Sequence, residues 1–237
     1  MAQHNPVIDP SAIGLISFDC YGTLIDWEQG ILGALRVLLA AHGQLPGPEE
    51  LLSAYAEYER AAETPPYRPY RQVLQMVIEG IGNRYGFLPD ASELDTLARS
   101  LPSWKPFDDT VPALRSLASH HPLAVCSNID DSLFETTARH LEVSFRTVVT
   151  AEAVGSYKPN PAHFAELLSR TGLPAEQILH VAQSLYHDIA PARSLGFRCV
   201  WLHRPSARHR FGATPRADAA PDFELDSMTA LARRMGV

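Results

Sequence analysis

Short apolar segments, separated by stretches with helical periodicity, constrain the fold of this chain most strongly. Each is at most five residues long, and most are followed by a polar or small residue. Continuous apolar strands that alternate with helices are typical of a parallel sheet buried on both faces. The chain is therefore predicted to have a Rossmann-like α/β core. The predicted strands span residues 14–18, 123–126, 147–149, 178–182 and 199–202.

The region that follows the first predicted strand has a different character, because it contains no strand signal. The prolines of segment 101–106 disfavour helix before them, so this segment suits a return linker. We therefore expect a helical cap over residues 27–105, inserted into a core formed by residues 1–26 and 106–237. Amphipathic helices are predicted in the cap over residues 31–42, 49–63 and 70–85.

Composition excludes several classes of protein. The net charge of −7 gives no basic field for nucleic acid or an anionic membrane surface. No apolar stretch reaches the length of a membrane span, and the first 14 residues lack a secretory pattern, so a cytoplasmic protein is expected. The three cysteines lie far apart, which argues against a zinc site or a disulfide framework. Residues 205–221, rich in arginine and proline, are expected to form a surface excursion before a last short strand and helix.

Polar residues follow the predicted strands at their carboxyl ends, where ligands bind in sheets of this kind. The parallel arrangement would bring a carboxylate, a hydroxyl, an ammonium and a second carboxylate to one edge. In strand order, these residues are Asp19, Tyr21 and Thr23, then Ser127 and Asn128, then Tyr157 and Lys158, and finally Gln183, Ser184 and Asp188.

Each catalytic candidate has a chemical reason. A carboxylate such as Asp19 can attack carbon or phosphorus without first losing a proton, and so forms a covalent intermediate. The Thr23 and Ser127 hydroxyls can donate hydrogen bonds to that nucleophile or to a substrate anion. Lys158 supplies a fixed positive charge beside several acids. Asp188 can hold Lys158 or help to orient the hydrolytic water.

The same residues also have structural interpretations that the sequence leaves open. Asp19 could cap a helix, and Ser127 with Asn128 could cap the next one. Lys158 could be a solvated loop residue, and Asp188 could cap a helix or form a salt bridge. Any one of these positions is a weak signal. Four of them in order, each at a strand end, favour the functional interpretation.

With these residues in this order, the chain resembles the haloacid dehalogenase superfamily. Asp19 matches the first motif of that superfamily, Ser127 the second, Lys158 the third and Asp188 the fourth. The resemblance extends from about residue 15 to residue 202. It implies a Rossmann-like core with an inserted cap, a nucleophilic Asp19, a small anionic substrate and a possible homodimer.

Two positions separate this chain from the phosphatases of the superfamily. Phosphatases carry a second aspartate two residues after the nucleophile, where this chain has Tyr21. They hold magnesium with an aspartate in the fourth motif, where this chain has Gln183, a poorer magnesium ligand. The chain instead resembles the 2-haloacid dehalogenase branch, in which Tyr-Gly-Thr follows the nucleophile.

That branch implies hydrolytic dehalogenation of short 2-haloalkanoic acids to 2-hydroxy acids. An aspartyl ester is the intermediate, and no metal or other cofactor is required. Two alternatives stay open. One is a phosphatase with a weakened magnesium site, and the other is a non-catalytic protein of the same fold that binds a small molecule.

The choice of substrate-binding candidates takes account of positions where this chain differs from that branch. The halide-binding arginine of the branch has no clean match within residues 49–63, and Phe164 stands where the branch carries a tyrosine. The arginine candidates are therefore Arg60, Arg68 and Arg71, with Trp104 as a possible edge-on contact. The remaining substrate-binding candidates are Tyr21, Asn128, Tyr157 and Gln183.

Overall fold

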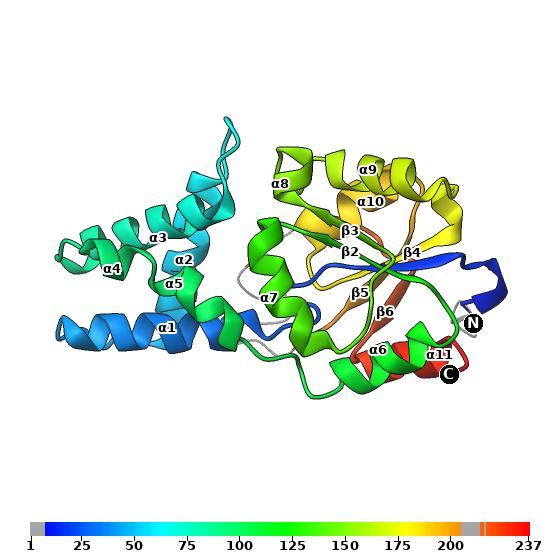
Figure 1. The fold of residues 1–237 in the computed structure, drawn as a ribbon, viewed down its shortest axis with the longest axis horizontal. Helices are drawn as coiled ribbons and strands as arrows, with labels where there is room; N and C mark the ends of the chain where they lie inside the picture. The colour runs from blue at the N-terminus through cyan, green and yellow to red at the C-terminus, as the bar shows by residue number, and fades with distance from the viewer. Residues whose placement is uncertain (1–7, 205–213, 216) are drawn as a thin grey trace.

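A six-stranded parallel sheet forms the core of the chain in a computed structural model, which describes residues 8–204, 214–215 and 217–237 (Figure 1). The strand order is β3-β2-β1-β4-β5-β6, and every neighbouring pair is parallel. The predicted α/β class is therefore confirmed. The strands are β1 (Leu15–Phe18), β2 (Leu123–Ser127), β3 (Thr147–Thr150), β4 (Ile178–Ala182), β5 (Arg198–Leu202) and β6 (Phe223–Leu225).

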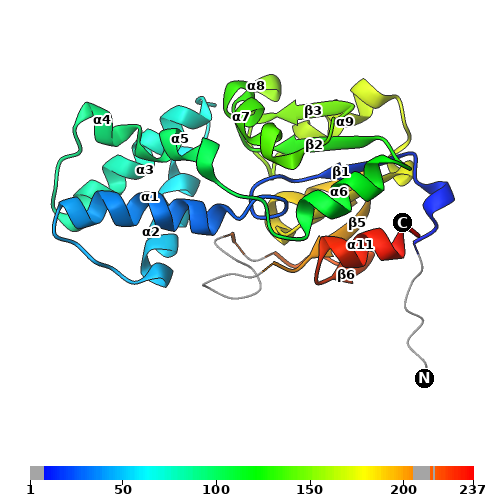
Figure 2. The same cartoon turned by 60° about the horizontal axis from the view of Figure 1, so that its bottom comes forward.

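Helices cover both faces of the sheet, which explains why the strands are apolar throughout. Successive strand residues enter different hydrophobic clusters: Ile16 and Phe18 pack on one side of the sheet, and Leu15 on the other. Figure 2 shows α6 and α11 side by side on one face. The core helices are α6 (Thr110–Ala118), α7 (Asp131–Leu141), α8 (Ala151–Val154), α9 (Ala162–Thr171), α10 (Ala190–Ser194) and α11 (Met228–Arg234).

A second group of helices lies at the end of the sheet toward which β1 runs (Figure 1). The first of them begins earlier than predicted, because the Asp26 side chain accepts a hydrogen bond from the Gln29 N–H and caps it. Asp90 forms a capping box with Glu93 and starts a short helix that the periodicity did not indicate. The helices are α1 (Trp27–Ala41), α2 (Pro48–Ala62), α3 (Tyr70–Tyr85), α4 (Ala91–Leu94) and α5 (Thr96–Ser100).

Two adjacent segments connect these cap helices to the sheet. The outgoing and returning chains pair at this connection, since the Asp26 N–H donates to the Lys105 carbonyl at 2.8 Å. An isolated antiparallel bridge joins Ile25 to Pro106. Single helical turns complete the described chain: η1 (Pro10–Ala12), η2 (Leu101–Ser103), η3 (Ala175–Gln177) and the π-helical η4 (Leu185–Ile189).

Further sequence expectations concern the surface excursion, the first residues of the chain, membrane spans and the cysteines. Most of the predicted surface excursion, residues 205–221, and half of the first 14 residues lie outside the described part of the chain. Within the described residues, no helix combines the length and the apolar character needed to cross a bilayer. All three cysteines are buried and carry free thiols.

Candidate active site

Asp19 follows β1 directly and is fixed by the loop that it begins. Its backbone N–H donates to the Val181 carbonyl of β4 at 3.1 Å. Gly22 has a φ of 89°, a conformation that glycine adopts easily, and the chain turns there. The turn lets the Thr23 hydroxyl donate to Asp19 Oδ2 at 2.6 Å, while the Gln183 N–H donates to Thr23 Oγ1 at 3.0 Å. One carboxylate oxygen of Asp19 is therefore held by a loop that is itself tied to the end of β4.

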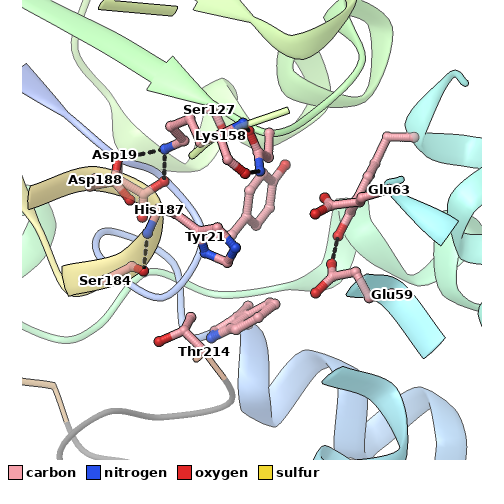
Figure 3. Close-up of a pocket in the computed structure, with 13 residues that line it drawn as sticks. Asp19, Tyr21, Glu59, Glu63, Ser127, Lys158, Ser184, His187, Asp188 and Thr214 are labelled. Atoms are coloured by element: carbon pink, nitrogen blue, oxygen red, sulfur yellow. Dashed lines mark hydrogen bonds and ion pairs between the residues drawn. The ribbon is translucent and has the colours of Figure 1, made fainter. Parts of the chain in front are cut away.

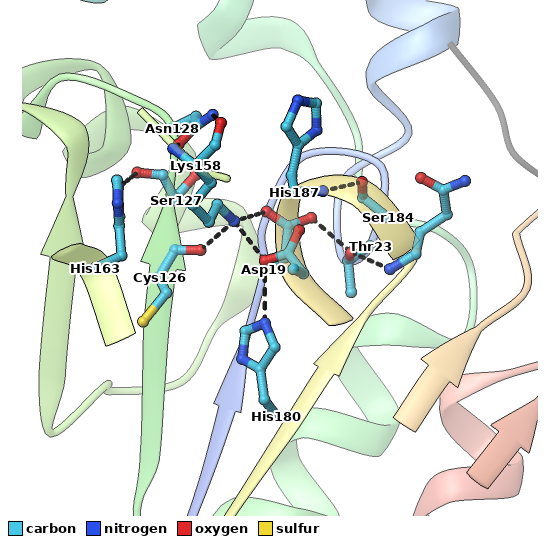
Figure 4. Close-up of polar contacts among 12 residues, drawn as sticks. Asp19, Thr23, Cys126, Ser127, Asn128, Lys158, His163, His180, Ser184 and His187 are labelled. Carbon is cyan, nitrogen blue, oxygen red and sulfur yellow. Dashed lines mark hydrogen bonds and ion pairs between the residues drawn. The ribbon is translucent and has the colours of Figure 1, made fainter. Parts of the chain in front are cut away.

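Lys158 joins the two acids of the site (Figure 4). Its Nζ donates to Asp19 Oδ1 at 2.9 Å, to Asp188 Oδ1 at 2.7 Å and to the Cys126 carbonyl at 2.9 Å. The Asn128 side chain holds the lysine backbone through bonds to both its N–H and its carbonyl. Because an ammonium has three N–H donors, all donors of Lys158 are used within the protein.

These ion pairs set the charges of the three groups. Burial acts to lower the pKa of Lys158, but the charges of Asp188 and Asp19 outweigh it and raise that pKa. Burial acts to raise the pKa of Asp188, but Lys158 and a hydrogen bond from His180 bring it down to about 2. Burial raises the pKa of Asp19, and the charge of Lys158 opposes this rise. Lys158 thus favours the ionised form of both carboxyls.

Two histidines, His180 and His187, lie near Asp188. His180 is fully buried on β4, with Asp188 Oδ1 at 3.0 Å from one ring nitrogen and Ser17 Oγ at 2.9 Å from the other. His187 lines the cavity described next, and its backbone N–H donates to Ser184 Oγ. Burial lowers the pKa of His187 to about 4, so its ring is neutral at pH 7.

A cavity of about 50 Å³ opens beside this network and is called the inner cavity here. Its core wall carries Asp19, Ser127, Lys158 and Asp188 (Figure 3). The Ser127 hydroxyl has no hydrogen-bond partner among the residues that the structure describes, although Ser127 is only 1% exposed. A buried hydroxyl of this kind is available to a ligand, since buried polar groups are normally paired.

The cap supplies the opposite wall of the inner cavity with Trp27, Glu59, Glu63 and Tyr70. A second cavity of about 340 Å³, the outer cavity, shares Glu63 with the inner cavity. It also shares Lys158 and His187, so the two spaces meet at these three residues.

Several predicted substrate-binding residues lie at or beside the inner cavity. Tyr21 and Asn128 line it, but the Tyr21 hydroxyl is bonded to Thr137 Oγ1 at 2.6 Å. Tyr157 and Arg60 line the outer cavity instead. Gln183 lies behind Asp19. Its backbone N–H donates to Thr23 Oγ1, and its carbonyl accepts a hydrogen bond from Trp201 Nε1.

Other predicted residues do not reach the inner cavity. Arg68 donates to backbone carbonyls of its own loop, including that of Thr64 at 3.0 Å. Arg71 pairs with Asp95 at 2.7 Å on the cap surface. Trp104 packs edge-on against Tyr21 with ring centroids 5.9 Å apart and is not among the described lining residues of the inner cavity. Each of these two guanidinium groups has a partner outside the inner cavity, so a substrate-binding role for Arg68 or Arg71 stays a prediction.

The sequence reasoning missed the two cap acids, Glu59 and Glu63. They stand one helical turn apart at the end of α2, so their side chains share a face. The Tyr55 and Tyr70 hydroxyls donate to Glu59 Oε1 at 2.8 and 2.6 Å. The spacing of the two acids was visible in the sequence, but the direction of that face depends on how the cap packs on the core.

Metal binding was expected only for the phosphatase alternative. Among the residues that the structure describes, no group of three or more His, Cys, Asp or Glu side chains is arranged to hold a metal ion. The magnesium-binding acid of the phosphatases is replaced by Gln183, and Lys158 Nζ lies between Asp19 and Asp188. This donor set does not fit the carboxylate-rich coordination of magnesium.

Haloacid dehalogenases and related hydrolases are among the known proteins that are similar to this chain. The (S)-2-haloacid dehalogenase of Pseudomonas putida is 25% identical over 215 residues, which are 87% of this chain and 89% of that protein. The haloacid dehalogenase-like hydrolase domain-containing protein 3 of Danio rerio is 33% identical over 156 residues, 62% of each chain. Proteins named as phosphoglycolate phosphatases are also similar.

Solved structures show the same fold. The L-2-haloacid dehalogenase of Xanthobacter autotrophicus superimposes with a TM-score of 0.78 at 21% identity, over 93% of this chain and 97% of that one. The sequence model of the haloacid dehalogenase-like hydrolases matches residues 13–196. This chain therefore belongs to the haloacid dehalogenase-like hydrolase family.

Proposed function

We propose that this hydrolase cleaves a carbon–halogen bond in a 2-haloalkanoic acid through an ester of Asp19. One carboxylate oxygen of Asp19 attacks the carbon that bears the halogen, and the halide leaves with the bonding electron pair. Water then attacks the ester carbonyl, which releases a 2-hydroxy acid, a proton and the regenerated carboxylate. Asp188, whose second oxygen is not used by Lys158 or His180, orients that water.

The observation that carries this proposal is the arrangement of Asp19 with Tyr21. Asp19 borders the inner cavity as a nucleophile, held by Thr23 and Lys158. No acid stands beside it at position 21, where the tyrosine hydroxyl is bonded to Thr137. Without a proton donor there, a leaving group that departs as a stable anion is favoured, and halide is such a group.

The unpartnered Ser127 hydroxyl supports an acidic substrate. It lies on the same wall as Asp19, so it can donate a hydrogen bond to the carboxylate of a 2-haloacid whose neighbouring carbon faces the nucleophile. The similarity to haloacid dehalogenases over most of the chain supports the same reaction.

A phosphatase is the second candidate, since phosphatases are among the similar proteins. Under that alternative, Asp19 would attack phosphorus and magnesium would be needed. Gln183 and Tyr21 count against it, because they replace the metal ligand and the acid of the phosphatases.

A paired assay tests the proposal. Purified protein is incubated with both enantiomers of 2-chloropropionate, and separately with p-nitrophenyl phosphate and magnesium, while chloride and phosphate are measured. We expect chloride from one enantiomer, and we expect Asp19→Asn to lower its release by at least roughly a thousandfold. Phosphate release that requires magnesium, without chloride, would establish the second candidate instead. If neither chloride nor phosphate is released, a protein that binds a small molecule without catalysis would be favoured.

A further inference from the structure

The inner cavity has an unusual charge balance for an anionic substrate. Lys158 is the only cation among its described lining residues, and its three N–H donors are already used by protein groups. His187 is neutral at pH 7, because burial lowers its pKa. The wall also carries carboxyl groups from both domains, namely Asp19, Asp188, Glu59 and Glu63.

The two cap acids are directed into the cavity (Figure 3). Glu59 is held by the Tyr55 and Tyr70 hydroxyls, which both donate to Oε1, and no other described residue bonds Oε2. The Glu63 carboxyl has no hydrogen-bond partner among the described residues, and it lies where the inner and outer cavities meet. Burial and the neighbouring Glu59 raise the pKa of Glu63, which disfavours its ionised form. A bound positive charge would oppose this effect and stabilise the carboxylate.

Aromatic rings surround these acids. Tyr70 lines the inner cavity, and Tyr67 and Tyr157 line the outer one. The ring centroid of Tyr157 lies 5.3 Å from that of Tyr67 and 6.2 Å from that of Tyr70. Aromatic faces beside carboxylates are the usual surroundings of bound organic ammonium groups. Arg60 lines the outer cavity as well, but the residue is exposed.

A ligand is indicated independently on the opposite wall. Ser127 is almost fully buried and its hydroxyl has no partner within the described part of the chain, so the core side offers a donor to an anionic group. The cap side offers acceptors and aromatic rings. A molecule that spans the cavity is therefore matched best when its two ends carry opposite charges.

We propose that the substrate of this site carries an organic ammonium group, which the Glu59 and Glu63 carboxyls and the rings of Tyr70 and Tyr157 receive. The assignment rests on the proposed function for the reacting end of the molecule, where the halogen-bearing carbon faces Asp19. It adds the chemical class of the other end and distinguishes this site from one built for simple 2-haloalkanoates.

Two isosteric substrates test the assignment. One is a 2-chloroalkanoate that ends in a trimethylammonium group, and the other ends in a tert-butyl group of the same shape. We expect the kcat/KM of the ammonium substrate to be higher by at least about tenfold, the ratio that one interaction with a charged group supports. Glu63→Gln and Glu59→Gln should each reduce this preference through KM.

The matched control is Glu57→Gln, because Glu57 lies on the same helix, is exposed and faces Arg84 at 3.8 Å. It should leave the preference unchanged. Equal kcat/KM for the two substrates, or a preference for the tert-butyl compound, would overturn the assignment.

A binding measurement separates the assignment from the proposed reaction. The affinity of Asp19→Asn protein for tetramethylammonium is measured by calorimetry, with and without Glu63→Gln. Binding that weakens at least about tenfold on Glu63→Gln supports the ammonium site even if no substrate releases chloride. Absence of tetramethylammonium binding, together with absence of chloride release, would overturn both proposals.

Discussion

At the scale of single residues, Lys158 determines whether the acids of the site can be ionised together. Its side chain is 1% exposed and contacts Asp19 and Asp188 at 2.9 and 2.7 Å. A buried ion pair contributes little net stability when it is complete, but the loss of one partner leaves an uncompensated buried charge. In this site the loss of Lys158 would leave two such charges.

Lys158→Met should therefore destabilise the protein in a pH-dependent way. We expect the free energy of unfolding to fall by about 3–5 kcal/mol at pH 7. Without the ammonium, burial raises the pKa of both carboxyls in the folded state, so the penalty applies above their unfolded pKa values. It should shrink as the pH falls toward 4, where both groups become protonated.

Urea unfolding at several pH values measures this effect. The other lysine of the chain, Lys105, is exposed, and Lys105→Met serves as the control. An unfolding free energy of Lys158→Met that equals that of Lys105→Met at pH 7 would show that Lys158 does not compensate the buried acids.

At the scale of elements, the start of α3 is held by the core. Its N-cap residue, Pro69, makes no capping hydrogen bond through its side chain. Asp130, from the loop after β2, instead accepts the Tyr70 and Arg71 N–H groups at 2.7 and 2.9 Å. The Tyr157 hydroxyl adds a second link to the cap at the Arg68 carbonyl. These contacts fix the end of the cap that carries the acidic wall of the inner cavity.

Asp130→Ala should weaken both stability and substrate binding. We expect a loss of about 0.5–2 kcal/mol in unfolding free energy, typical of a lost helix cap, and a severalfold rise in KM with a smaller change in kcat. The matched control is Asp90→Ala, which removes the cap of α4 within the cap domain. A KM that is unchanged in Asp130→Ala, or raised equally in Asp90→Ala, would contradict this role.

At the scale of the whole molecule, the sheet and the core wall of the site could be predicted from the sequence. Parallel strands end at one edge, so residues after β1, β3 and β4 had to converge, and the structure brings Asp19, Lys158 and Asp188 within hydrogen-bond distance. The wall that the cap contributes to the inner cavity could not be predicted in this way. Which face of α2 meets the core depends on long-range packing, and for this reason Glu59 and Glu63 were missed.

The hydrogen-bond partners of Arg68 and Arg71 could not be predicted from the sequence either. A guanidinium near the start of α3 is available to a substrate only if nothing closer engages it. The loop carbonyls around Arg68 and the carboxylate of Asp95 beside Arg71 engage the two guanidinium groups. These partners depend on loop geometry that periodicity and motif spacing do not encode.

The central claim, covalent catalysis by Asp19, is tested most directly by isotope transfer. A single turnover is run in H₂¹⁸O with protein in excess over the 2-chloroalkanoate that releases most chloride, and the peptide containing Asp19 is analysed by mass spectrometry. Because water attacks the ester carbonyl, ¹⁸O should enter the Asp19 carboxylate, and the 2-hydroxy acid should carry none. Label in the product with none in Asp19 would mean that water attacks the substrate directly, and would contradict the account.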